Sequence, residues 1–255
     1  MSKVVNQMGA SMSVITSVET FLDAIRTYTA IQTGQCLESR ISWWLAYHRC
    51  LLRTLERYRD IHTTYMHARQ RYRHQRVGRE HGVSHRTIVV RHELAAIHDL
   101  YSELQCEGES FYTLAIGVLD SIADTFQCYF GLSWDRSAAT HARLSRHFHF
   151  LCAEKDLVLT PTALRLLMPD VHACIAESRA RLTSMTDVGC LMTCLSKIDA
   201  YSAAMLQFFA MNGEKSVLAG LWLLADAPSA LTAHAAHTRL DDPHVFSAPV
   251  HPVLS

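Results

Sequence analysis

Glycine and proline are scarce in this sequence, with ten and six residues in 255. Three of the prolines, Pro243, Pro249 and Pro252, fall in the last thirteen residues, so the preceding chain has few residues that interrupt helices. Alternating strand patterns are nearly absent, whereas apolar residues recur at three- and four-residue steps. We therefore expect an all-α protein, with a single helical domain at 1–225 and an irregular C-terminal tail at 226–255.

Long apolar runs and cysteine motifs are also missing. The longest apolar stretch, 217–225, is far shorter than the roughly 20 residues of a membrane-spanning helix, and the N-terminal segment MSKVVNQMGA does not resemble a signal peptide. Eight cysteines are present without a C-x-x-C pair, and Cys190 and Cys194 are spaced one helical turn apart between apolar neighbours. These features predict a cytoplasmic protein with eight free cysteines and no membrane role.

Sequence motifs for common chemistries are absent. There is no glycine-rich phosphate loop, no G-x-S-x-G elbow and no dinucleotide fingerprint. His81 and His85 lie four residues apart, and a second histidine group comprises His141, His147 and His149. Neither group has the neighbouring carboxylate and third ligand of a zinc site. We therefore expect no metal and no cofactor.

Charge is distributed very unevenly. Eleven of the twenty arginines lie between Arg49 and Arg91, a window without lysine and with only three acidic residues. The window therefore carries a formal charge of +8, and because the whole chain is neutral, the remainder carries −8. Such asymmetry indicates an anion-binding face, whether for nucleic acid, a membrane surface or another part of the same chain.

The arginine-rich window overlaps a long predicted helix at 38–76, which contains no glycine or proline. Aromatic and apolar residues recur there every seven positions, at Trp44, Leu51, Tyr58, Tyr65 and Tyr72. Four residues after each of the first four come His48, Leu55, His62 and Arg69. The pattern predicts one long, coiled-coil-like helix of about 55 to 60 Å at 1.5 Å per residue, which is longer than a compact domain needs.

Further helices are predicted on both sides. The first covers 13–31 and ends at Gly34, with a buried face of Val14, Val18, Phe21, Leu22, Ile25 and Tyr28. A core bundle is expected over residues 84–225. Its helices are predicted from a cap at Ser84 to about 104, from Ser110 to Phe130, and at 137–152. A helix pair then begins at Thr160-Pro161 and runs through 171 to 182 and over 188–209, before a last helix at 216–225. The segment 107–110 is predicted to be a turn, and Gly131 to end the core helix.

The core helix carries Asp120 and Asp124 one turn apart. These two carboxyl groups could act as an acid/base pair, but this spacing more often indicates a solvated face or a partner for arginine. An acidic row is formed with three upstream residues, Glu103, Glu107 and Glu109. This row could neutralise the arginines inside one bundle, although five acids cannot pair eleven arginines.

The arginines themselves suggest a nucleic-acid site. Guanidinium groups bind phosphates bidentately, and tyrosine rings stack on unpaired bases. The candidate nucleic-acid-binding residues are Arg53, Arg57, Arg69, Arg71, Arg73, Arg76, Tyr65 and Tyr72.

The core helix with its neighbours resembles the helical domains of the HEPN superfamily. The resemblance lies in Glu109-Ser-Phe-Tyr112, Leu119-Asp120, Ile122-Ala123 and Tyr129-Phe-Gly131, and it covers residues 85–210. It implies a helical bundle, often dimeric, whose active members are metal-independent ribonucleases with an Arg-x4-6-His motif. Arg143 with His149 fits that motif as a candidate catalytic pair, but about four matches are expected from composition alone. In the segment that would align with the family motif, 177–187, there is no histidine.

We therefore expect a non-catalytic or weakly catalytic HEPN-like protein that binds RNA or another polyanion and forms a homodimer. One alternative is a scaffold whose long helix pairs with a helical protein partner. The other is an active ribonuclease of the HEPN type.

Overall fold

The chain is an all-α helical bundle, as predicted. The computed structural model describes residues 2–28, 32–77, 86–132, 140–158, 163–182 and 187–219, and these residues contain no β-strand. The elements in chain order are α1 (Ser2–Tyr28), α2 (Gln32–Val77), α3 (Arg86–Tyr129), α4 (His141–Glu154), α5 (Ala163–Leu182), α6 (Val188–Met211) and the short 3-10 helix η3 (Gly213–Lys215).

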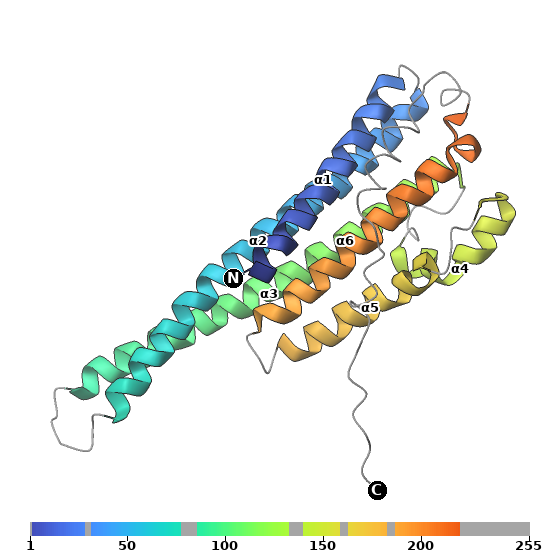
Figure 1. Ribbon diagram of the computed structural model, residues 1–255. Coiled ribbons are helices and arrows are strands. Elements are labelled where there is room, and N and C mark those ends of the chain that lie inside the picture. Colours follow the sequence, from blue (N-terminus) through green and yellow to red (C-terminus); the bar gives the residue numbers. More distant parts are fainter. Residues whose placement is uncertain are drawn as a thin grey trace, which may run out of the picture.

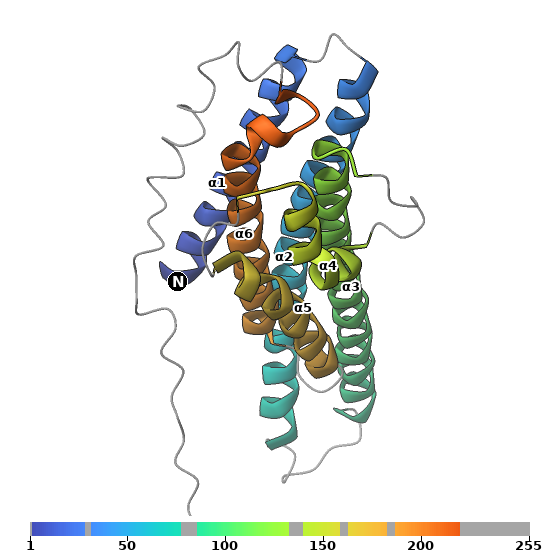
Figure 2. The same cartoon turned by 90° about the vertical axis from the view of Figure 1, so that its right-hand side faces the viewer.

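Four helices form an elongated bundle. α1, α2, α3 and α6 run lengthwise beside one another, while α5 packs on α6 and α3, and α4 packs on α3 (Figures 1 and 2). α2 and α3 form the most extensive of these contacts and extend beyond the other helices at one end (Figure 1).

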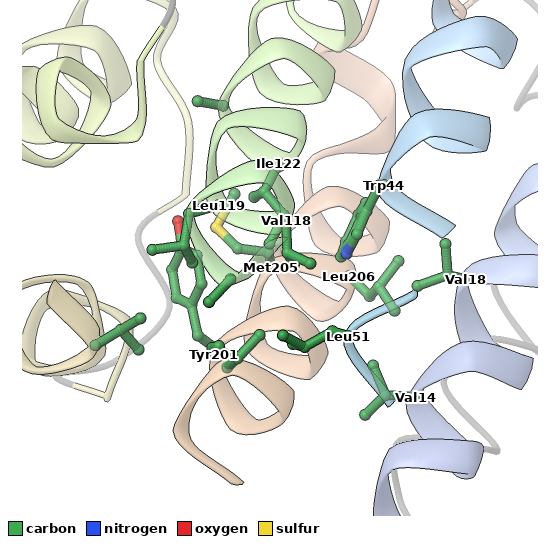
Figure 3. Packing of buried hydrophobic residues seen from close by; sticks show 14 of the residues in the cluster. Val14, Val18, Trp44, Leu51, Val118, Leu119, Ile122, Tyr201, Met205 and Leu206 are labelled. Carbon is green, nitrogen blue, oxygen red and sulfur yellow. The ribbon is translucent and has the colours of Figure 1, made fainter. Parts of the chain in front are cut away.

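The core lies among α1, α2, α3 and α6. Figure 3 shows Val14 and Val18 of α1 facing Trp44 and Leu51 of α2, with residues of α3 and α6 completing the cluster. The predicted buried face of the first helix is confirmed for Val14, Val18, Phe21, Leu22 and Ile25. Burying such side chains stabilises the fold by about 1.5 to 3 kcal/mol each.

The heptad pattern of α2 is confirmed as one uninterrupted helix. Trp44, Leu51 and Tyr58 are fully buried, and Tyr65 is only 8% exposed. Tyr72 is partly buried. The seven-residue spacing therefore marks the side of α2 that faces the rest of the bundle.

The predicted turn at 107–110 is wrong, because α3 runs through it without a break. Gly108 is buried inside the helix, and Ser110 donates a hydrogen bond to the carbonyl of Cys106 instead of capping a new helix. A glycine in a helix interior costs about 1 kcal/mol. The complete burial of Leu104, Phe111 and Tyr112 on the same side outweighs that cost.

Some helix boundaries also differ from the predictions. α1 spans Ser2–Tyr28, and Gly34 lies in the first turn of α2 rather than ending α1. α4 begins at His141 instead of Ser137. Of the last predicted helix, Ser216–Leu218 form a turn and Ala219 is helical, while 220–225 lie outside the described residues. The predicted cap at Ser84 and the tail at 226–255 lie outside the described residues.

The end of α3 has the geometry predicted from its glycine. Gly131 has a φ of 62°, in the left-handed region that favours glycine, and the N–H of Leu132 donates to the carbonyl of Gln127 at 3.0 Å. This arrangement satisfies carbonyls that the helix end leaves free and ends α3.

Candidate polyanion interface

α2 and α3 continue past the bundle as a two-helix arm, which we define as residues 62–77 and 86–103 (Figure 1). Its seam contains Tyr65, whose ring centroid lies 6.2 Å from that of Tyr101, together with the buried Ala68. Ile97 also packs against the core cluster. The apolar seam therefore fixes which sides of the two helices face each other and which face outward.

Arginines beside the bundle are held in ion pairs. Arg49 of α2 pairs with Glu19 of α1. Arg57 donates to Glu107 of α3 at 2.6 Å, and the side chain of Glu107 is only 12% exposed. Glu107 of the acidic row thus neutralises Arg57, as expected if the row and the basic window pair inside one bundle.

Arginines on the arm are placed differently. Arg69, Arg71 and Arg73 are exposed, and none forms an ion pair with a carboxylate in the described part of the chain. At 100° per residue, Arg69 and Arg73 lie on one flank of α2 and Arg71 lies about 200° from both. The three guanidinium groups therefore lie on two flanks of α2 instead of forming one flat face.

The remaining candidate residues have mixed placements. Arg53 is exposed and has no ion pair with any residue that the structure describes, but it lies beside the bundle. The side chain of Arg76 is outside the described residues. Tyr65 and Tyr72 belong to the seam, and the ring of Tyr65 would have to leave Tyr101 before a base could stack on it.

The acidic row is divided among several partners. Glu109 accepts from Arg179 of α5 at 2.6 Å, and Glu103 is exposed. Asp124 pairs with Arg40 at 2.8 Å, and Asp120 accepts the backbone N–H of His141 at 2.8 Å. Apart from Glu103, the row therefore connects α3 to α2, α4 and α5 rather than opposing the arginines of the arm.

Asp120 and Asp124 border a cleft of about 270 Å³ between α2 and α3. Trp43 projects from its wall with 55% of its surface exposed. Burial raises the pKa of Asp124, although the Arg40 guanidinium opposes this shift. Asp124 is thus a partner for an arginine, as one of the expectations has it, whereas Asp120 accepts a backbone N–H instead.

The candidate catalytic pair lies on α4. Arg143 is partly buried and His149 is exposed, and α4 is continuous between them. Six residues correspond to 600°, so their side chains point about 240° apart around the helix axis. Within one chain, the two groups do not converge on a common substrate position.

A buried polar cluster was missed by sequence reasoning. Asp199 of α6 accepts hydrogen bonds from Ser11 of α1 and from His48 of α2, the latter at 2.8 Å. All three residues are buried. The aspartate lies between the serine and the histidine, so the histidine does not contact the hydroxyl and the cluster lacks the geometry of a nucleophilic triad. Its position indicates a structural role that joins three helices.

A second missed cluster joins α4 and α5. His141 Nδ1 lies 2.5 Å from His172 Nε2, and the His141 ring lies edge-on to Tyr201 with a centroid distance of 4.9 Å. Burial, with a smaller effect from His172, lowers the pKa of His141 to about 3. Burial also lowers the pKa of His172, against the opposing effect of Asp120. Both imidazoles are therefore neutral near pH 7.

The described residues contain no group of three or more histidine, cysteine, aspartate or glutamate side chains suited to a metal ion. Within the same ranges, no helix combines the length and apolar character needed to cross a membrane. Comparison with protein-family models, with curated proteins and with solved structures found no match.

Proposed function

We propose that the chain binds RNA through the arginine-rich end of the α2–α3 arm, without catalysing its cleavage. The observation that carries this proposal is the contrast between arginines: Arg49 and Arg57 beside the bundle are ion-paired, whereas Arg69, Arg71 and Arg73 on the arm are exposed and have no described carboxylate partner. The α2 part of the arm, residues 62–77, contains four arginines and no acidic residue in its sequence, so positive charge is concentrated on this helix.

The side chains of the arm are better suited to bind the phosphates of a nucleic acid than to recognise its bases. Guanidinium groups bind phosphate oxygens bidentately, and their placement on two flanks of α2 suits a strand that wraps around the arm. Tyr65 is held in the seam by Tyr101, so it contributes to the shape of the arm rather than to stacking. We therefore expect binding with little sequence preference. The choice of RNA rests on the resemblance to HEPN domains.

The test replaces two arm arginines, as Arg71→Glu with Arg73→Glu, and measures single-stranded RNA binding by fluorescence anisotropy over a range of salt concentrations. Each lost phosphate contact removes about 0.7 from the slope of log affinity against log salt. The double variant should therefore lose about 1.4 in slope and bind at least about 25-fold more weakly at 0.1 M salt.

The matched control makes the same charge change away from the arm, as Arg26→Glu with Arg179→Glu, because these arginines already pair with Glu38 and Glu109. Circular dichroism should show unchanged helicity in both variants. Equal loss of binding in the two variants would point to net charge alone, and undiminished binding in the arm variant would exclude the arm. Equal affinity for heparin would leave a general polyanion site instead of an RNA site.

A scaffold function is the second candidate, and exposed apolar side chains on the arm favour it. Met66 and Leu94 are 44% and 51% exposed. Pairing with another helix, including that of a second copy in a homodimer, would cover them. Apolar pairing persists in 1 M salt, whereas phosphate binding does not, so sedimentation at high salt distinguishes the two.

Catalysis is tested separately. We expect the purified protein to leave RNA intact beyond background, and His149→Ala to change nothing, because Arg143 and His149 point to different sides of α4. Denaturing gels of RNA incubated with chelator measure this. Metal-independent cleavage that disappears in His149→Ala would establish the ribonuclease alternative.

A further inference from the structure

Two cysteines meet at the bundle end of the α2–α3 pair. Cys36 Sγ, near the start of α2, lies 3.6 Å from Cys128 Sγ, near the end of α3, although 92 residues separate them in the chain. Cys36 is exposed and Cys128 is partly buried. The contact is therefore long-range and reachable from solvent.

The backbones beside these thiols are already held together. Arg40, one turn after Cys36, pairs with Asp124, one turn before Cys128, at 2.8 Å. Farther along, the Tyr47 ring packs so closely on Gly117 that an added Cβ would lie 2.9 Å from it. A disulfide needs a sulfur separation of about 2.05 Å. Because α2 and α3 are fixed in register, the required approach is mainly a side-chain rotation.

The surroundings give the two thiols different roles. Burial, together with the Cys36 thiol, raises the pKa of Cys128 to about 11, so this group stays protonated at neutral pH. Cys36 is the exposed partner, next to the Arg40 guanidinium. An incoming oxidant therefore meets Cys36 first, and Cys128 is placed to react with the oxidised sulfur.

The other cysteines lack either a nearby second thiol or access from solvent. Cys174 and Cys194 lie 3.4 Å apart, but they are only 8% and 1% exposed. Cys50 and Cys106 are exposed without a sulfur contact among the described residues. Cys36 with Cys128 thus combines proximity with access.

We propose that Cys36 and Cys128 form a reversible disulfide in response to hydrogen peroxide. Cys36 thiolate attacks one peroxide oxygen, the O–O bond breaks and the sulfur becomes a sulfenic acid, while the leaving hydroxide takes up the proton that Cys36 had released and becomes water. Cys128 then attacks the Cys36 sulfur and gives its thiol proton to the departing hydroxide, so the S–O bond breaks and a second water leaves as the S–S bond forms. The two thiols are oxidised by two electrons and one peroxide is reduced to two waters. The new bond clamps α2 to α3 at the end opposite the arm.

The experiment treats the full chain with stoichiometric hydrogen peroxide, alkylates the remaining thiols and maps peptides without reduction. A Cys36–Cys128 linked peptide that disappears after dithiothreitol is the expected result. The link closes a 92-residue separation and restricts the unfolded chain, so the melting temperature should rise by several degrees on oxidation. The rise should occur in the wild type and in the exposed-cysteine control Cys50→Ser, but not in Cys128→Ser.

Trapping of the intermediate distinguishes the two roles. In Cys128→Ser, the sulfenic acid on Cys36 has no partner, so dimedone should label Cys36 there and much less in the wild type. Three outcomes would each overturn the proposal: irreversible sulfinic acid on wild-type Cys36, a Cys174–Cys194 link that forms first, or linked peptides that contain Cys50 or Cys106. RNA binding is measured independently, so its failure would leave this result unaffected.

Discussion

Asp199→Ala is expected to lower the free energy of unfolding by about 2 to 6 kcal/mol, because each of two buried groups left without a hydrogen-bond partner costs about 1 to 3 kcal/mol. The carboxylate accepts hydrogen bonds from Ser11 and His48, and both of these side chains are completely buried. Alanine would leave a hydroxyl and an imidazole nitrogen without partners and without water. Urea unfolding followed by circular dichroism measures the loss.

The control for Asp199→Ala is Asp170→Ala. Asp170 pairs with Lys197 at 2.8 Å, but its side chain is 43% exposed, so its removal should cost less than about 1 kcal/mol. If Asp199→Ala does not fold, Asp199→Asn keeps one acceptor and should give an intermediate loss. A cost for Asp199→Ala no larger than that of Asp170→Ala would show that the cluster contributes little to stability.

Stability should also fall as the pH is lowered from 7.5 to 5. The unfolded chain protonates His141 below a pKa of 6.5, whereas the folded chain keeps it neutral until the pH approaches 3. Between these values the unfolded state binds one more proton, so acid favours unfolding. A single such group contributes roughly 2 kcal/mol of destabilisation at pH 5, and His172, whose pKa is lowered as well, adds to it.

The groups around His141 support this assignment. Asp120 of α3 accepts its backbone N–H, His172 of α5 contacts its ring nitrogen, and Tyr201 of α6 covers its ring. His141→Gln removes the titrating ring but keeps the backbone hydrogen bond. Its unfolding free energy should therefore depend on pH less steeply than that of the wild type. His149→Gln, an exposed change on the same helix, should leave the dependence unaltered, and identical slopes in all three proteins would refute the explanation.

Features with a local periodic signature could be predicted from the sequence. The seven-residue spacing of Trp44, Leu51 and Tyr58 encodes the buried side of α2 without reference to any other helix. Gly108 shows the limit of local rules, because its cost in a helix is small compared with the burial of its neighbours. Whether a glycine ends a helix therefore depends on how the neighbouring side chains pack against other helices, which the local sequence does not reveal.

The candidate interface could be predicted only in part. Composition identified the basic window, but it could not show which arginines are ion-paired. Arg57 pairs with Glu107, whereas Arg71 is exposed and has no described carboxylate partner. That distinction depends on the register of α2 against α3. The Asp199 cluster was even harder to predict from the sequence, because its members come from three helices and Ser11 is 188 residues from Asp199. The local signs are two polar residues among apolar ones: His48, four residues after Trp44, and Asp199 in the apolar sequence of α6.

The antiparallel pairing of α2 with α3 also sets an order in which the chain can close. Tyr65 and Tyr101 meet across 36 residues, Arg40 and Asp124 across 84, and Cys36 and Cys128 across 92. Each contact brings the next pair of positions together. The two helices can therefore pair progressively from the arm toward the bundle, and each step adds little to the entropic cost of loop closure. The hydrogen bond between Ser11 of α1 and Asp199 of α6 spans 188 residues. Forming it first would carry an entropic cost of loop closure about 1.5 kcal/mol higher than that of the Tyr65–Tyr101 contact. The arm that projects from the finished bundle is thus the place where its assembly most easily begins.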